Sequence, residues 1–131
     1  MNKLVIVETF FSKQFTKFIL RDNDDHIEIA VTGTSGFVGK ALCYALRANN
    51  FKVIKIVRSN LNIFNSLELR EFLRGNRVRS LINCAGFTGK PNVDACESAK
   101  YESLQGNAVL PGIVREVCED LHIPWGHISS G

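Results

Sequence analysis

The glycine-rich stretch from Thr32 to Gly39 is the part of the sequence best suited to binding a charged ligand. Its three glycines follow the spacing Gly-x-x-Gly-x-x-Gly. The apolar run over 27–31 before it predicts a buried strand, and apolar residues at helical spacing after it predict a helix. Glycine allows a tight turn and close backbone approach, and a helix N-terminus offers free amide groups and a positive dipole to phosphate. Strand, glycine turn and helix in this order therefore predict a dinucleotide-binding site.

Arg58 follows the second predicted strand, over 51–57. Dinucleotide-binding folds place an acidic residue near the end of this strand, where it binds the ribose 2′-hydroxyl. Here the strand is followed by Arg58-Ser59-Asn60, without an acid. Because a planar guanidinium suits a 2′-phosphate, the sequence favours NADP as the cofactor, with NAD as the alternative. Arg58 can also be read as a solvated charge at a strand end.

Further elements position these residues. The pattern predicts a short third strand over 61–63, then a helix that begins at the capping pair Asn65 and Glu68 and ends at Gly75. A fourth strand is predicted over 79–83, followed by the small residues of the segment 84–86, which would let a cofactor pass close to the backbone. An ordinary transition from strand to loop would also favour glycine there. A long helical stretch and a fifth strand near the C-terminus follow.

The domain organisation has two parts. Residues 27–131 form the dinucleotide-binding domain, and residues 1–26 form an N-terminal extension. In the extension, 4–7 reads as a strand, and the aromatic residues that follow share one helical face, which predicts an extra β-α unit. A tail from an upstream domain and a misplaced start codon are the alternatives.

Composition excludes several classes of protein. The chain has 131 residues, of which 45% are hydrophobic and 22% charged, as in an ordinary globular protein. Its net charge of +3 comes without a basic block, which argues against a nucleic-acid partner. No apolar run suits a membrane span or a signal peptide, so we expect a cytoplasmic protein. The four cysteines and three histidines lack metal-ligand spacing, so we expect reduced thiols and no metal.

Three blocks of sequence carry a resemblance to a known family. They are NCAGFT at 83–88, VDACE at 93–97 and NAVLP at 107–111. Together with the glycine pattern, they resemble dTDP-4-dehydrorhamnose reductase and the epimerase/reductase part of plant nucleotide-rhamnose synthases, which are extended short-chain dehydrogenase/reductases. The resemblance covers residues 27–131. It implies an α/β fold with a doubly wound, parallel, Rossmann-like sheet that stops after the family's fifth strand.

The resemblance also implies an activity and a set of site residues. The activity is NADPH-dependent reduction of a 4-keto-6-deoxy nucleotide sugar, either alone or coupled to epimerisation. Ser130, the second member of a Ser-Ser pair, would hydrogen-bond the reacting carbonyl or hydroxyl. Asn62 and Ile63 would flank the adenine, and Arg58 would meet the 2′-phosphate. The pyrophosphate would be held by Gly33, Ser35, Gly36, Phe37, Val38 and Gly39. The cofactor cleft would be lined by Cys84, Ala85, Gly86 and Thr88.

The family's catalytic tyrosine, with a lysine four residues later, has no counterpart in this sequence. The two tyrosines, Tyr44 and Tyr101, are followed at that spacing by Ala48 and Gln105, and both precede Ser130. Whether the chain is an enzyme is therefore left open. It is expected to be the N-terminal piece of a reductase whose nucleotide-sugar site needs a C-terminal segment. The alternatives are a non-catalytic NADP-binding sensor and an inactive fragment. An exposed sheet edge after the fifth strand predicts a homodimer or a complementing chain.

Overall fold

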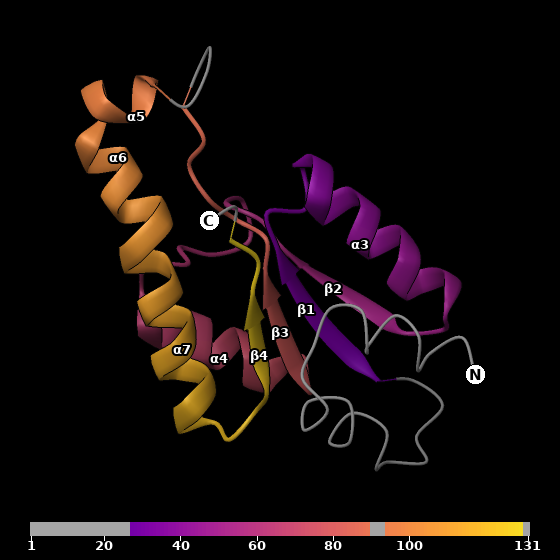
Figure 1. Ribbon diagram of the computed structural model, residues 1–131. Helices are drawn as coiled ribbons and strands as arrows, with labels where there is room; N and C mark the ends of the chain where they lie inside the picture. Colours follow the sequence, from indigo (N-terminus) through magenta and orange to yellow (C-terminus); the bar gives the residue numbers. More distant parts are fainter. Residues whose placement is uncertain (1–26, 90–93, 130–131) are drawn as a thin grey trace.

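The computed structural model describes residues 27–89 and 94–129. The predicted β-α unit over 1–26 and the predicted catalytic residue Ser130 lie outside the described residues. Figure 1 shows a sheet with helices packed beside it. In the parts of the chain that the structure describes, no helix is long and apolar enough to cross a membrane.

The sheet has four parallel strands in the order β2-β1-β3-β4. This order confirms the predicted doubly wound α/β fold, because the chain first steps from β1 to β2 on one side and then returns to β3 on the other. The strands are β1 (Glu28–Thr32), β2 (Lys52–Ile56), β3 (Ser80–Asn83) and β4 (Trp125–His127). They correspond to the predicted first, second, fourth and fifth strands, which are thereby confirmed.

The helices follow the apolar periodicity of the sequence. In the first helix, the buried residues Gly39, Leu42, Cys43 and Leu46 recur three or four positions apart and form one face. The helices are α3 (Phe37–Ala48), α4 (Ser66–Gly75), α5 (Ala95–Ser98), α6 (Lys100–Leu104) and α7 (Leu110–Asp120), with a π-helical turn η1 (Gln105–Val109) between the last two.

The predicted third strand over 61–63 is wrong, because local hydrogen bonds occupy its backbone. The amide of Asn62 donates to the Glu68 carboxylate at 2.9 Å, and the Asn62 side-chain oxygen accepts from the Phe64 amide at 3.1 Å. The Asn62 carbonyl accepts from the amide of Asn65 at 2.9 Å. Asparagine favours such turns over a sheet ladder. The chain therefore passes from β2 to α4 through a loop.

The start of α4 is confirmed as predicted. The Asn65 side-chain oxygen accepts from the amides of Leu67 and Glu68, at 3.1 and 3.3 Å. The Glu68 carboxylate also accepts from the Asn65 side-chain amide at 3.1 Å. The first-turn amides of the helix are thus satisfied by a side chain, as an N-cap requires.

The predicted long helical stretch is divided into shorter pieces. It breaks at Ala99, between α5 and α6, and its middle widens into the turn η1. Pro111 lies in the first turn of α7, directly after this turn. Because proline has no amide hydrogen, it cannot make the regular helical bond there, and a π-helical turn next to it accommodates the missing donor.

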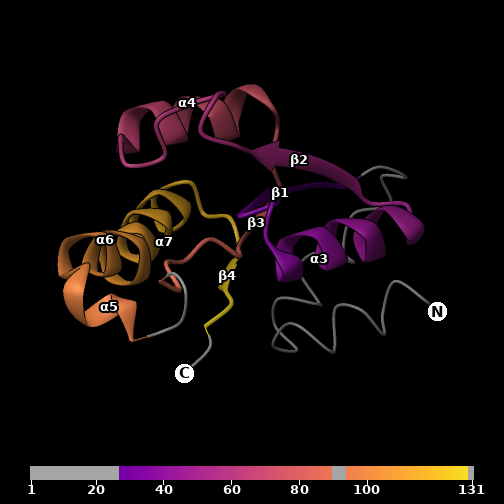
Figure 2. The same cartoon turned by 90° about the horizontal axis from the view of Figure 1, so that it is seen from above.

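The core has two layers, one on each face of the sheet. Ile29 and Val31 of β1 pack against α3, whereas Ala30 between them faces α4 and α7. Figure 2 shows α3 on one side of the sheet and α4 and α7 on the other. All three β1 residues are at most 1% exposed, as expected for a central parallel strand that is covered on both faces. Because β1 is buried and paired on both sides, its carboxyl end and that of β3 are held in fixed positions.

Candidate functional site

The candidate site lies where the carboxyl ends of β1 and β3 meet. Thr32, the last residue of β1, is in register with Asn83, the last residue of β3. From this point the chain turns toward β2 after β1, and toward β4 after β3. A crevice forms at such a switch point in open α/β sheets, and ligands bind in it. The glycine turn and the segment 84–86, which were predicted separately, are brought together here.

Gly33 forms the contact between the two strand ends. Its φ of 65° is left-handed, a conformation that favours glycine. A Cβ atom built on Gly33 would lie 2.5 Å from the Ala85 amide nitrogen and 2.6 Å from the Cys84 carbonyl oxygen. Both the backbone conformation and the space therefore require glycine at this position, and the glycine turn rests directly on the backbone of Cys84 and Ala85.

Gly36 differs from Gly33 because the fold does not require it. Its backbone is extended, with φ −77° and ψ 168°, and an added Cβ atom would make an ordinary 3.4 Å contact. It precedes α3, whose N-terminus has no side-chain cap. Ser35, Phe37 and Val38 around it are exposed, Phe37 by 91%. The first amides of α3 are thus left without a side-chain cap among exposed residues, which fits the binding of a pyrophosphate group.

A buried polar network joins three strand ends below this opening. The Thr32 hydroxyl donates to the Asn83 side-chain oxygen, which also accepts from the Ala85 amide at 3.2 Å. The Asn83 side-chain amide donates to Nδ1 of His127 at 3.0 Å. Thr32 and Asn83 are almost fully buried, so these bonds satisfy groups that water cannot reach. The network fixes the backbone of Ala85 and ties β4 to β3.

The loop after β3 is held by a second asparagine. Asn107, in η1, accepts from the Phe87 amide at 2.8 Å and donates to the Phe87 carbonyl at 2.9 Å. Gly106 lies against the same segment, since an added Cβ atom would lie 3.0 Å from Phe87 Cβ. Gly86 and Thr88, on either side of Phe87, are exposed. The segment predicted to line the cleft therefore has a fixed path up to Gly89.

The residues predicted to bind the adenosine end lie in the loop between β2 and α4. Arg58 is exposed in the turn directly after β2. Asn62 is exposed, and its side-chain oxygen accepts a hydrogen bond from the Phe64 amide. Ile63 is half-buried and packs against the core beside α4. These positions follow the carboxyl end of β2, which is in register with the end of β1. Their roles stay predictions.

The thiol of Cys84 is not an activated nucleophile. Burial raises its pKa to about 11, so the thiol is protonated at neutral pH. All four cysteines are free. Within residues 27–89 and 94–129, no three His, Cys, Asp or Glu side chains are grouped so that they could hold a metal ion. Cys84 therefore contributes its small size and its backbone, which lies against Gly33.

Sequence reasoning did not assign roles to Thr32, Asn83, His127 or Asn107. The bonds from Asn83 to Thr32 and to His127, and from Asn107 to Phe87, join segments distant in sequence, so spacing gave no signal for them. A polar residue at the buried end of a strand, as Asn83 is, was the one available indication, because buried amides need partners.

Comparison with known proteins gives consistent results. The family model described as RmlD substrate binding domain matches residues 27–131. The dTDP-4-keto-6-deoxy-D-glucose reductase of Streptomyces niveus is 33% identical over 76% of this chain and 34% of its own length. The dTDP-4-dehydrorhamnose reductase of Mycolicibacterium smegmatis is 30% identical over 78% of this chain and 30% of its own length.

A solved structure shows the same fold. The dTDP-4-dehydrorhamnose reductase of Bacillus anthracis, crystallised in complex with NADP, superposes with a TM-score of 0.67 at 20% identity. The match covers 79% of this chain and 36% of that one. The chain spans about a third of the length of the relatives it matches.

Proposed function

Because the chain belongs to the RmlD substrate binding domain family, we propose that residues 27–131 form the NADP-binding part of a reductase acting on a 4-keto-6-deoxy nucleotide sugar. The observation that carries the proposal is that two glycines of the same turn have different surroundings. Gly33 is packed against Cys84 and Ala85, whereas Gly36 opens onto the uncapped N-terminus of α3. A turn that served the fold alone would not need the second glycine.

The residues of the site fit the cofactor. The Gly36 amide already donates to the Gly33 carbonyl at 3.1 Å. The amides of Phe37 and Val38, next to Gly36, would therefore bind the pyrophosphate, assisted by the dipole of α3. Arg58 is the proposed ligand of the 2′-phosphate, and Asn62 and Ile63 are proposed to flank the adenine. Support for NADP comes from the Bacillus anthracis reductase, which was crystallised with it. The bound cofactor would supply the hydride for the reduction.

The chain's own residues position the reacting groups. Cys84, Ala85 and Gly86 would leave room beside the backbone, and Thr88 would line the rim of the same cleft. The bonds of Asn83 hold Ala85 in place and anchor the end of β4, because the Ile128 amide donates to the Asn83 carbonyl at 3.0 Å. Ser130, two residues beyond Ile128, is the proposed donor of a hydrogen bond to the sugar carbonyl. The proton-donating tyrosine would come from a segment outside residues 27–131.

A chimera tests the reaction class. Residues 27–131 replace the matching third of the dTDP-4-dehydrorhamnose reductase of Mycolicibacterium smegmatis, and NADPH oxidation is followed with dTDP-4-dehydrorhamnose. We expect substrate-dependent oxidation, and its loss when Ser130 in the chimera is changed to alanine. A folded chimera that binds NADPH but never oxidises it would contradict the reductase proposal and favour a non-catalytic cofactor-binding module.

A further inference from the structure

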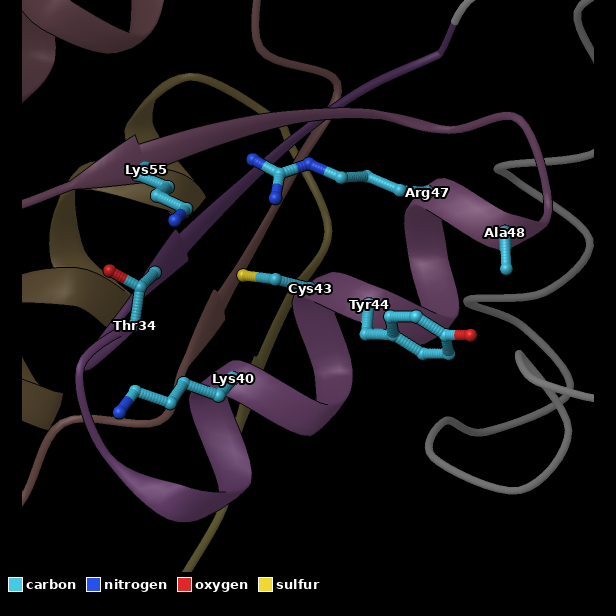
Figure 3. A pocket seen from close by; sticks show the side chains of 7 residues that line it. All are labelled: Thr34, Lys40, Cys43, Tyr44, Arg47, Ala48 and Lys55. Carbon is cyan, nitrogen blue, oxygen red and sulfur yellow. The ribbon is translucent and has the colours of Figure 1, made fainter.

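A pocket lies beside the glycine turn, on the α3 side of β2. We call it the α3–β2 pocket; its volume is about 580 Å³. Figure 3 shows that its lining comes from one face of α3, from the end of β2 and from the turn itself. It is lined by Thr34, Lys40, Cys43, Tyr44, Arg47, Ala48 and Lys55. Except for Thr34, which belongs to the glycine turn, none of these residues is assigned above to the cofactor site.

The charge of the pocket is uniformly positive. Lys40, Arg47 and Lys55 line it, and no carboxylate does. In the described part of the chain, none of the three cations has an ion-pair partner within 4.0 Å; for comparison, Lys52 of the same strand pairs with Glu28 at 3.7 Å. Cations that line one concave surface repel one another and concentrate anions from solution. A bound anion would supply the counter-charge that the described residues do not.

The cations come from positions that the fold fixes. Lys40 and Arg47 are seven residues apart on α3, hence on one face, and Lys55 precedes the last residue of β2. Figure 3 shows the Arg47 guanidinium extending from α3 past Cys43 toward the side of Lys55, and Thr34 below Lys55 in this view. Thr34 is 7% exposed and directly follows Gly33. The pocket therefore adjoins the edge of the sheet where the proposed cofactor site lies.

The lining selects the chemistry of the ligand. A metal cation is disfavoured, because the lining offers three positive charges and only the Cys43 thiol as a soft ligand. Burial raises the pKa of that thiol, although Arg47 and Lys55 oppose the shift, so it is neutral at physiological pH. A phosphate monoester carries up to two negative charges and three acceptor oxygens, which can bond several cations and a hydroxyl together.

We propose that the α3–β2 pocket is a binding site for a phosphate monoester. Two sources share this chemistry. One is the ribose phosphate that distinguishes NADPH from NADH, and this source rests on the proposed function. The other is a free phosphate monoester that binds beside the cofactor. If the ligand is the ribose phosphate, this pocket and not Arg58 sets the preference of the chain for NADPH over NADH.

The test is calorimetric titration of the full chain in a buffer of low ionic strength without phosphate or sulfate. The ligands are NADPH, NADH and inorganic phosphate, and the variants are Lys55→Ala and Arg47→Ala. Both side chains are exposed, so both variants should fold, which circular dichroism checks. Lys52→Ala is the matched control, because it removes the same charge from the same strand outside the pocket. Arg58→Ala tests the competing assignment.

We expect each pocket variant to weaken phosphate-dependent binding about tenfold or more, and Lys52→Ala to leave it within about twofold. If the pocket variants lose affinity for NADPH but not for NADH, the ribose phosphate is identified as the ligand. If they lose affinity for inorganic phosphate while the ratio of their affinities for NADPH and NADH is unchanged, a free monoester is identified as the ligand. Unchanged binding of all ligands in both pocket variants would overturn the proposal. It would also be overturned if only Arg58→Ala removes the NADPH preference and neither pocket variant weakens the binding of inorganic phosphate. If the wild-type chain binds neither dinucleotide, the proposed function fails, while the inorganic phosphate titration still tests the pocket.

Discussion

Gly39 lies so close to Gly33 that a Cβ atom built on Gly39 would lie 2.0 Å from the Gly33 carbonyl oxygen. The first turn of α3 is therefore packed directly on the glycine turn. Gly36, which lies between them in sequence, has no comparable neighbour. One motif thus contains glycines that the fold needs and a glycine that only a ligand would need, and substitutions can separate the two functions.

Gly39→Ala should destabilise the fold. The added methyl group collides with backbone atoms that cannot move without opening the turn, so we expect the free energy of unfolding to fall by about 1–3 kcal/mol. Urea unfolding measures this change. Gly112→Ala in α7 is the control: nothing lies within 4 Å of its Cβ position, so the better helix former should leave stability unchanged or raise it. Equal stability of Gly39→Ala and wild type would show that the turn is not tightly packed.

Asn83→Ala should cost about 2 kcal/mol or more of unfolding free energy. The substitution removes the partner of the Thr32 hydroxyl and of His127, and it empties a fully buried volume. The comparison is Asn60→Ala, an exposed asparagine with one side-chain bond to the Lys55 carbonyl at 3.2 Å, for which we expect a change below about 0.5 kcal/mol. Similar urea midpoints for the two variants would contradict the structural role of the network.

Cys118 should make the fold less stable in alkali. Burial raises the pKa of its thiol from 9.0 to about 12, so the folded state holds the proton more tightly than the unfolded state. Because the pKa is higher in the folded state, the protonated thiol contributes to the free energy of unfolding at pH values below 9.0, the pKa in the unfolded state. This contribution is lost as pH rises from 9.0 toward about 12. Between about pH 8.5 and about pH 10, wild type should lose about 1 kcal/mol more than Cys118→Ala. Parallel pH profiles of urea unfolding would refute the assignment.

Much of the fold follows from short-range patterns in the sequence. β1 and α3 were predictable because their apolar residues recur with the periods of a strand and a helix, and the glycine turn between them has few alternative conformations. The strand over 61–63 was predicted wrongly because the side chain of Asn62 supplies a turn that apolar neighbours do not reveal. The division of the last helical stretch also escaped prediction, since η1 depends on how the chain accommodates Pro111.

The site was predictable in part for the same reason. Gly33 and the segment 84–86 were identified from local sequence, but their contact depends on the pairing of β1 with β3. The bonds from Asn83 to Thr32 and His127 span 51 and 44 residues, so no spacing rule could predict them. The pocket cations, Lys40, Arg47 and Lys55, looked like ordinary surface charges until the fold placed them together.

The central claim is that the opening at Gly36 binds the cofactor, and calorimetric titration with NADPH of wild type and Gly36→Asp tests it most directly. The backbone at Gly36 accepts any residue, so the variant should keep its fold and its unfolding free energy within about 0.5 kcal/mol. The carboxylate of the variant would occupy the proposed pyrophosphate position and would repel the negatively charged pyrophosphate. We predict saturable binding by wild type and at least a tenfold loss, roughly 1.4 kcal/mol, in the variant. Absence of NADPH binding by the folded wild-type chain, or equal binding by the variant, would contradict the account.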